Sequence, residues 1–126
     1  MKHETGIISV IPVLPSSDID RDIEWYLAKA GFESIWADKM YAVLHREGLS
    51  IHLQWHAGTS DDPLNGGSVI RILVKNIRPI FEEFVERGTV KRNELILDTA
   101  WGTNEIGLFD LNSNAIFFAE DLTRNE

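Results

Sequence analysis

Hydrophobic and polar residues alternate most strictly over residues 49–56, LSIHLQWH. Four large apolar side chains occupy the odd positions of this stretch, and a serine, a glutamine and two histidines occupy the even ones. Such alternation is the period of a strand that buries one face. The polar face lies against either solvent or a binding cavity, where its histidines and amide would ligate a metal, transfer a proton or hydrogen-bond a ligand.

Local patterns divide the first half of the chain into five elements. Residues 6–14, GIISVIPVL, are rich in β-branched side chains and predict a strand. A helix follows, with Asp18 as its N-cap and Gly31 as the left-handed residue at its end. Three further strands are predicted over 32–38, 40–47 and 49–56.

The second half repeats this order after a linker over residues 57–67, which is rich in turn-forming residues. A strand is predicted over 68–76, and a helix over 77–87 with Pro79 in its first turn. An Asn-Ser-Asn turn separates the last two of the strands that follow. These final strands are predicted over 94–100, 104–111 and 115–121.

The order βαβββ therefore occurs twice. It predicts a single α+β domain over residues 1–126, with modules at about 6–56 and 68–121. Each module has one helix for one face of its sheet, so the other face needs cover from the second module, a partner chain or a ligand.

Composition narrows the classes of function. The 126 residues hold 12 Lys and Arg against 20 Asp and Glu, a net charge of −8, which disfavours nucleic acid or an anionic membrane as partner. The absence of cysteine excludes disulfides, thiolate metal sites and cysteine nucleophiles. No stretch approaches the roughly 20 apolar residues of a membrane span, and the first residues lack the features of a secretory signal, so we expect a cytoplasmic protein.

Several strings, taken in their order and spacing, resemble the vicinal oxygen chelate superfamily, which includes glyoxalases, extradiol dioxygenases, fosfomycin-modifying enzymes and bleomycin resistance proteins. Residues 10–32, VIPVLPSSDIDRDIEWYLAKAGF, resemble the family's opening strand and helix. Residues 100–121, AWGTNEIGLFDLNSNAIFFAED, resemble the closing hairpin of the bleomycin resistance branch. The family's Asp-Pro-x-Gly-Asn turn appears there as residues 110–114, DLNSN, without its proline and glycine.

The resemblance implies paired βαβββ modules that form a curved, cavity-enclosing mixed sheet. It also implies a homodimer in which an arm leaves at Pro12 and crosses to the partner. The superfamily's enzymes take metal ligands from four strands, and the matching positions are Ile11, His52, Val69 and Phe117. Only His52 offers a ligating side chain, so the resemblance implies no metal, no cofactor and no catalytic residue of the familiar kind.

The resemblance also indicates where a ligand would bind. If His52 marks the cavity side, strand period places Gln54 there too. In the bleomycin resistance proteins aromatic rings grip the ligand in grooves between two subunits, and Tyr41 and Trp101 match two such positions. Arg71 replaces a tryptophan, and its guanidinium can still stack but adds a positive charge that would disfavour the cationic bleomycins. The predicted ligand-binding residues are Tyr41, His52, Gln54, Arg71 and Trp101.

Ordinary structural roles are open for the same residues. Trp101 would equally cap the core, and His52 would equally be a histidine hydrogen-bonded between strands. Trp36 belongs to the core, a dimer interface or the pocket, whereas alternation favours Trp55 in the core. The aromatic residues of the two helices are assigned to the core: Trp25, Tyr26, Phe81 and Phe84.

The leading hypothesis is a non-catalytic homodimer that sequesters a small molecule, such as a glycopeptide antibiotic or an aromatic metabolite, in two interfacial grooves. Removal of a drug by mass action would confer antibiotic resistance without turnover. The alternative is a glyoxalase-like lyase or isomerase, or a dioxygenase-type enzyme, with a displaced metal site and His52 as base. A third hypothesis is an interaction module with a vestigial groove.

Overall fold

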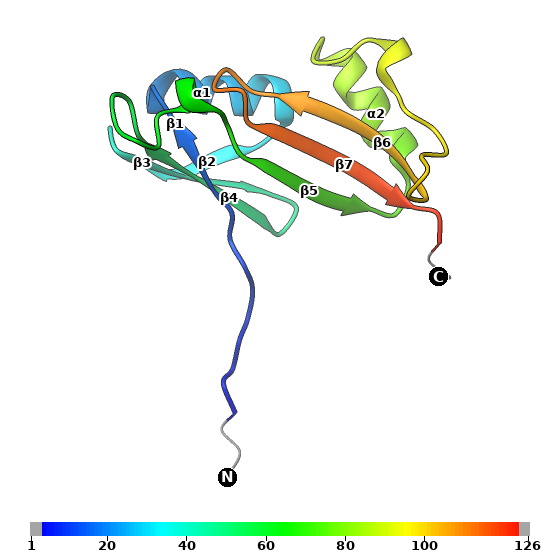
Figure 1. Cartoon of the computed structure of the whole chain (residues 1–126), viewed down its shortest axis with the longest axis horizontal. Coiled ribbons are helices and arrows are strands. Elements are labelled where there is room, and N and C mark those ends of the chain that lie inside the picture. Colours follow the sequence, from blue (N-terminus) through cyan, green and yellow to red (C-terminus); the bar gives the residue numbers. More distant parts are fainter. Residues whose placement is uncertain (1–3, 124–126) are drawn as a thin grey trace.

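The computed structural model describes residues 4–123, which form two β-sheets with both helices on one side of them (Figure 1). The first module contains β1 (Val13–Ser16), α1 (Ile19–Trp25), β2 (Glu33–Ala37), β3 (Tyr41–Arg46) and β4 (Leu49–Trp55). The second contains β5 (Val69–Val74), α2 (Ile77–Glu86), β6 (Thr103–Phe109) and β7 (Ala115–Asp121). No helix within residues 4–123 has the length and apolar character needed to cross a membrane.

Both predicted helices are present, and the first begins at its predicted cap, Asp18. The Asp18 side chain accepts a hydrogen bond from the backbone N–H of Arg21, and Asn76 caps α2 in the same way. The first helix continues beyond α1 as a π-helical segment, Tyr26–Ala30, and ends at Gly31 with φ 73°. Glycine suits position 31 because it adopts this left-handed conformation without strain.

Each sheet mixes parallel and antiparallel strands, which confirms the α+β class. The first sheet has the order β1-β4-β3-β2 and the second the order β5-β7-β6. The pairs β1–β4 and β5–β7 are parallel, whereas the hairpin pairs are antiparallel. The two modules therefore share this pattern of strand pairing, except that the second sheet has no counterpart of β2.

Two predicted strands differ from the structure, because one is absent and the other is shorter than predicted. The segment 94–100 forms no strand, because a 3₁₀ turn over Arg92–Glu94 precedes it and only Ile96 bridges to β6 before Asp98 turns away with φ 51°. The first strand begins at Val13 and not at residue 6, since the backbone of residues 4–12 runs away from the body as an arm (Figure 1). A strand requires a ladder partner as well as suitable residues, and among residues 4–123 the arm before Pro12 pairs with no strand.

One hydrophobic core runs beneath both sheets and under the helices. Tyr26 and Phe84 are fully buried and Phe81 is 3% exposed, while Trp25 packs against the core from its edge, so the core assignment of the helix aromatics holds. Trp55 is partly buried against the same cluster, as alternation predicts. Burial of each large side chain contributes about 1.5–3 kcal/mol. The core therefore joins the modules into one unit.

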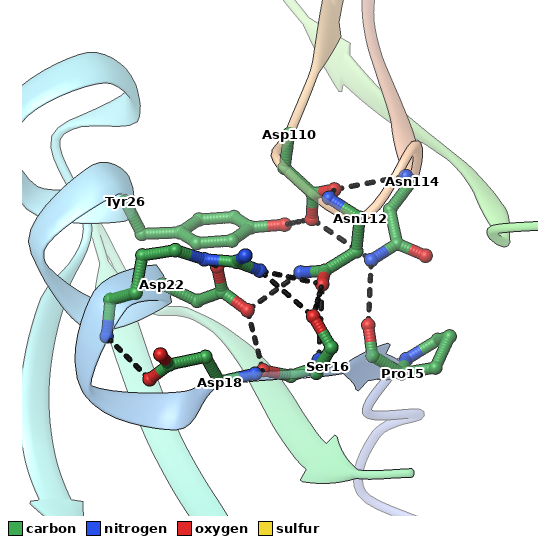
Figure 2. Close-up of polar contacts among 10 residues, drawn as sticks. Pro15, Ser16, Asp18, Asp22, Tyr26, Asp110, Asn112 and Asn114 are labelled. Carbon is green, nitrogen blue, oxygen red and sulfur yellow. Dashed lines mark hydrogen bonds and ion pairs between the residues drawn. The ribbon is translucent and has the colours of Figure 1, made fainter. Parts of the chain in front are cut away.

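A buried polar cluster ties the turn between β6 and β7 to the first module (Figure 2). The Tyr26 hydroxyl donates to Asp110, and burial together with that carboxylate raises the pKa of Tyr26. The Asn114 amide donates to the backbone oxygen of Pro15 at 3.0 Å and to Asp110 Oδ2 at 2.9 Å. Ser113 adopts φ 61°, so a serine holds the left-handed position that glycine takes in the family's turn.

Arginines close the second junction between the modules. Arg46 of β3 makes two hydrogen bonds to Glu83 of α2, at 2.7 and 2.6 Å, and one to the backbone oxygen of Ala30. Arg87 donates to the backbone oxygens of Leu27 and Ala28 at the end of the first helix. The helix ends are thereby fixed relative to one another on the side away from the open sheet faces.

We predict that Asn114→Ala lowers the free energy of unfolding by about 2–3 kcal/mol, because Pro15 and Asp110 lose a partner in a buried cluster. Urea denaturation followed by circular dichroism measures the change. The matched control is Asn65→Ala on the exposed linker, which should change stability by less than about 0.5 kcal/mol. Equal effects of the two substitutions would contradict a structural role for the cluster.

Candidate ligand-binding face

The sides of the two sheets that face away from α1 and α2 form an extended surface, here called the open face. On β4, Ile51 and Leu53 are fully buried toward the helices, whereas His52 and Gln54 lie on the open face. The alternation of residues 49–56 is therefore confirmed, and its polar side is this face. Apolar side chains are exposed along it on both sheets: Val13 44%, Val69 65%, Leu73 57% and Phe109 63%.

Three of the predicted binding residues lie together on the first sheet. The Tyr41 hydroxyl and His52 Nδ1 are 2.7 Å apart, and their rings meet edge to face at 5.3 Å. Gln54 lies directly opposite Tyr41 in the ladder and hydrogen-bonds His56 at 2.9 Å. This group presents aromatic, imidazole and amide chemistry from two neighbouring strands.

An open hollow of about 310 Å³ adjoins this group. It lies between β1, the end of β4 and the linker. Gln54 and His56 supply its polar wall from the strand side, and Asp61 and Asn65 supply polar groups from the linker. The volume lies at the lower end of the range of ligand pockets, about 300–1,000 Å³.

Trp36 also lies on the open face, and the reason is a β-bulge. The ladder between β2 and β3 pairs Ser34 with Leu44 and then Trp36 with Val43, so Ile35 is the extra residue. Directly paired residues lie on one side of a sheet, and Val43 faces away from the core. Trp36, which is 55% exposed, therefore joins the aromatic surface around Tyr41.

On the second sheet a carboxylate that the sequence analysis missed organises the two remaining predicted residues. Glu105 of β6 is 2% exposed and accepts two hydrogen bonds from Arg71, at 3.0 and 3.2 Å. Its Oε1 also accepts from the Trp101 indole N–H at 2.8 Å and from the Thr103 hydroxyl at 2.6 Å. Arg71 is the main reason that the pKa of Glu105 falls to about 2.

This ion pair corrects the prediction that Arg71 adds an unopposed positive charge. The Arg71 side chain crosses β7 above Ala119, which is fully buried and directly opposite Glu105 in the ladder. A small residue at position 119 leaves room for the two side chains to meet. The pair is neutral overall, so the physical objection to a cationic ligand no longer holds.

An aromatic platform adjoins the pair. The Arg71 guanidinium lies over the Phe117 ring, 5.6 Å from its centroid, and Phe109 meets Phe117 edge to face at 6.2 Å. Gly107 lies opposite Phe117 in the ladder, and a Cβ there would lie 2.9 Å from that ring. Glycine thus lets the Phe117 ring lie across β6. The alternation of residues 104–111 was a signal that Phe109 and Glu105 share this face.

The predicted binding residues form two groups on different sheets. Tyr41, His52 and Gln54 belong to the first sheet. Arg71 belongs to the second sheet, and Trp101 lies in the turn that leads into its strand β6. Within residues 4–123, no hydrogen bond, ion pair or ring contact joins the groups. Nor do three His, Cys, Asp or Glu side chains gather in the described part of the chain in an arrangement suited to a metal ion.

No family model matches the sequence. A bleomycin resistance protein of Geobacillus stearothermophilus is 25% identical over 130 aligned residues, which cover 92% of this chain and 98% of that protein. Bleomycin resistance proteins of Staphylococcus aureus match to the same extent.

Solved structures with similar folds include a bleomycin resistance determinant encoded on the transposon Tn5. It is 20% identical, with a TM-score of 0.71, and the match covers 91% of this chain and 98% of that one. A bleomycin-binding protein complexed with bleomycin has a TM-score of 0.75 at 19% identity, covering 91% and 99%. A glyoxalase/bleomycin resistance protein/dioxygenase from Nocardioides also reaches 0.75, at 13% identity, covering 98% and 89%. The chain therefore has the fold of these solved bleomycin-binding and glyoxalase/bleomycin resistance/dioxygenase structures, and its sequence is similar over nearly its whole length to bleomycin resistance proteins.

Proposed function

We propose that this protein binds and sequesters a bleomycin-type small molecule, without turnover, in grooves that form where the open faces of two copies meet. The observation that carries the proposal is the open face itself, where aromatic rings and hydrogen-bonding groups are exposed on both sheets. Trp101 is 66% exposed, and its indole N–H donates a hydrogen bond to Glu105. Its ring is therefore fixed and accessible for stacking and is not part of the core. Relatives named for bleomycin resistance, and a neighbour complexed with the drug, support the ligand class.

Pairing of two copies would bring the two groups of binding residues together. One copy would contribute Tyr41, His52 and Gln54 from its first sheet, and the other would contribute Arg71 and Trp101 from its second. Exposed aromatic and apolar side chains on both sheets would supply the walls, and the polar residues would orient the ligand. The neutral Arg71–Glu105 pair is compatible with the positive charge of the drug.

The arm supports a homodimer. Ile7, Ile8 and Val10 are 84%, 96% and 88% exposed on a backbone that extends away from the body (Figure 1). Exposure of three β-branched side chains within four residues is unfavourable in water, and contact with another surface would relieve it. We propose that the arm leaves at Pro12, whose backbone oxygen accepts the last ladder bond from His52, and packs on the second copy.

Binding is tested by titration of chelator-treated protein with metal-free bleomycin, followed by calorimetry and tryptophan fluorescence. We expect saturable binding of one drug per chain. Trp101→Ala should weaken it by about tenfold or more, because the loss of a stacking ring costs on the order of 1.4 kcal/mol. Leu64→Ala, at a 91% exposed linker position, is the control and should bind as the wild type does. Absence of saturable binding to the wild type would overturn the proposed ligand.

The role of the arm is tested by sedimentation velocity. The full chain should sediment as a dimer, and removal of residues 2–11 should shift it toward the monomer, because the apolar arm side chains no longer bury surface on the second copy. Circular dichroism should be unchanged, since no named strand or helix includes these residues. A full chain that sediments as a monomer at calorimetric concentrations would contradict the dimer.

A further inference from the structure

Glu105 is a buried carboxylate whose position the hydrophobic core does not explain. It lies on the open side of β6, between Ile106 of the core and the exposed ring of Trp101. Burial of a charge is costly unless hydrogen bonds replace its hydration, and here four donated hydrogen bonds do so. An apolar residue would fill such a position at lower cost, so the carboxylate calls for another explanation.

The hydrogen-bond partners of Glu105 indicate why a carboxylate occupies this position. Two of its three partner residues, Arg71 and Trp101, are those for which we propose ligand contact, and both are far more exposed than the carboxylate. The Arg71 side chain is 42% exposed and that of Glu105 only 3%. The carboxylate therefore lies behind the residues that a ligand would touch.

Closure of the turn before β6 does not depend on Glu105. Thr99 and Thr103 close that turn themselves, with a backbone bond at 2.9 Å and a bond from the Thr103 N–H to the Thr99 hydroxyl at 3.0 Å. Their hydroxyl oxygens also lie 2.8 Å apart. The two threonines therefore close the turn without the Glu105 side chain, so closure of the turn does not explain this carboxylate.

We propose that Glu105 is the positioning residue of the ligand-binding face. Its carboxylate neutralises Arg71, so that the face accepts a cationic ligand, and it holds the Trp101 ring in place for stacking. This inference rests on the proposed function for the ligand, but the tether to Trp101 is measurable without one. Glu105 itself is not expected to contact the ligand, since Arg71, Trp101 and Thr103 surround its oxygens.

The tether is tested by ¹⁹F NMR of protein labelled with 5-fluorotryptophan. The four tryptophans give four resonances, and Trp101→Phe assigns that of Trp101. Glu105→Ala should shift the Trp101 resonance and leave those of the other three tryptophans in place, whereas Glu105→Gln, which keeps an acceptor for the indole, should shift it less. A Trp101 resonance that is unaffected by Glu105→Ala would overturn the positioning role whatever the ligand proves to be.

The same resonance reports the charge of the carboxylate. The pKa of Glu105 lies near 2, with Arg71 of β5 as the main cause, so wild-type Trp101 should show no inflection between pH 8 and pH 4. Asp121 of β7, a further titratable residue, lies opposite Thr103 in the ladder. In Arg71→Gln the pKa should rise toward its ordinary value near 4.5, and an inflection should enter this range. An inflection near pH 4.5 in the wild type would show that the pair is not ionised as proposed.

The charge role is tested by calorimetric titration with metal-free bleomycin as the cationic probe. Glu105→Gln leaves Arg71 unpaired and should weaken binding on the order of tenfold through like-charge repulsion. The double variant Glu105→Gln with Arg71→Gln restores neutrality and should recover affinity to within about threefold of the wild type. The control is Glu82→Gln on α2, which breaks a two-bond pair with Arg92 of the following 3₁₀ turn. It makes the same change in net charge and should have no effect.

Two results would overturn the charge role. One is wild-type affinity in Glu105→Gln, and the other is a double variant that binds no better than Glu105→Gln. Failure of the wild type to bind would overturn the proposed function instead, and the ¹⁹F result would then decide the positioning role alone. The two hypotheses can therefore fail separately.

Discussion

A β-strand turns successive side chains to opposite faces, and each sheet of this protein has a single helix to cover one of them. The buried faces meet under α1 and α2 in one continuous core, and within residues 4–123 no helix covers the other face of either sheet. The exposed residues there are large and apolar or aromatic, so the surface is suited to a partner, a ligand or both. The proposed dimer and its grooves follow from that single constraint.

Charge on the open face is controlled by one buried residue. The resemblance implies an aromatic ring at position 71, where this sequence has an arginine, and an unpaired guanidinium would oppose a cationic ligand. Glu105 removes the objection, because its ion pair with Arg71 is neutral and leaves the flat guanidinium over the ring of Phe117. The positive charge of Arg71 on β5 is thus compensated by Glu105 on β6 of the same sheet.

Much of the fold was predictable because its signals are local. Alternation in β4 and the capping residue Asp18 each depend on a few neighbouring residues. Strand formation at 94–100 failed because β-propensity does not supply a ladder partner. The ion pair was missed because Arg71 and Glu105 lie 34 positions apart, and alternation fixes the face of each residue without showing which residue lies beside it.

The central claim is that each ligand groove is built from the first sheet of one copy and the second sheet of the other. The most direct test is a mixed dimer, purified through two different tags, of a Tyr41→Ala chain with a Trp101→Ala chain. If each groove combines two copies, one groove of the mixed dimer carries both defects and the other carries none. Our account then predicts one bleomycin bound per mixed dimer with wild-type affinity. Two weakened sites, and none of wild-type affinity, would show that each site lies within a single chain and would contradict the account.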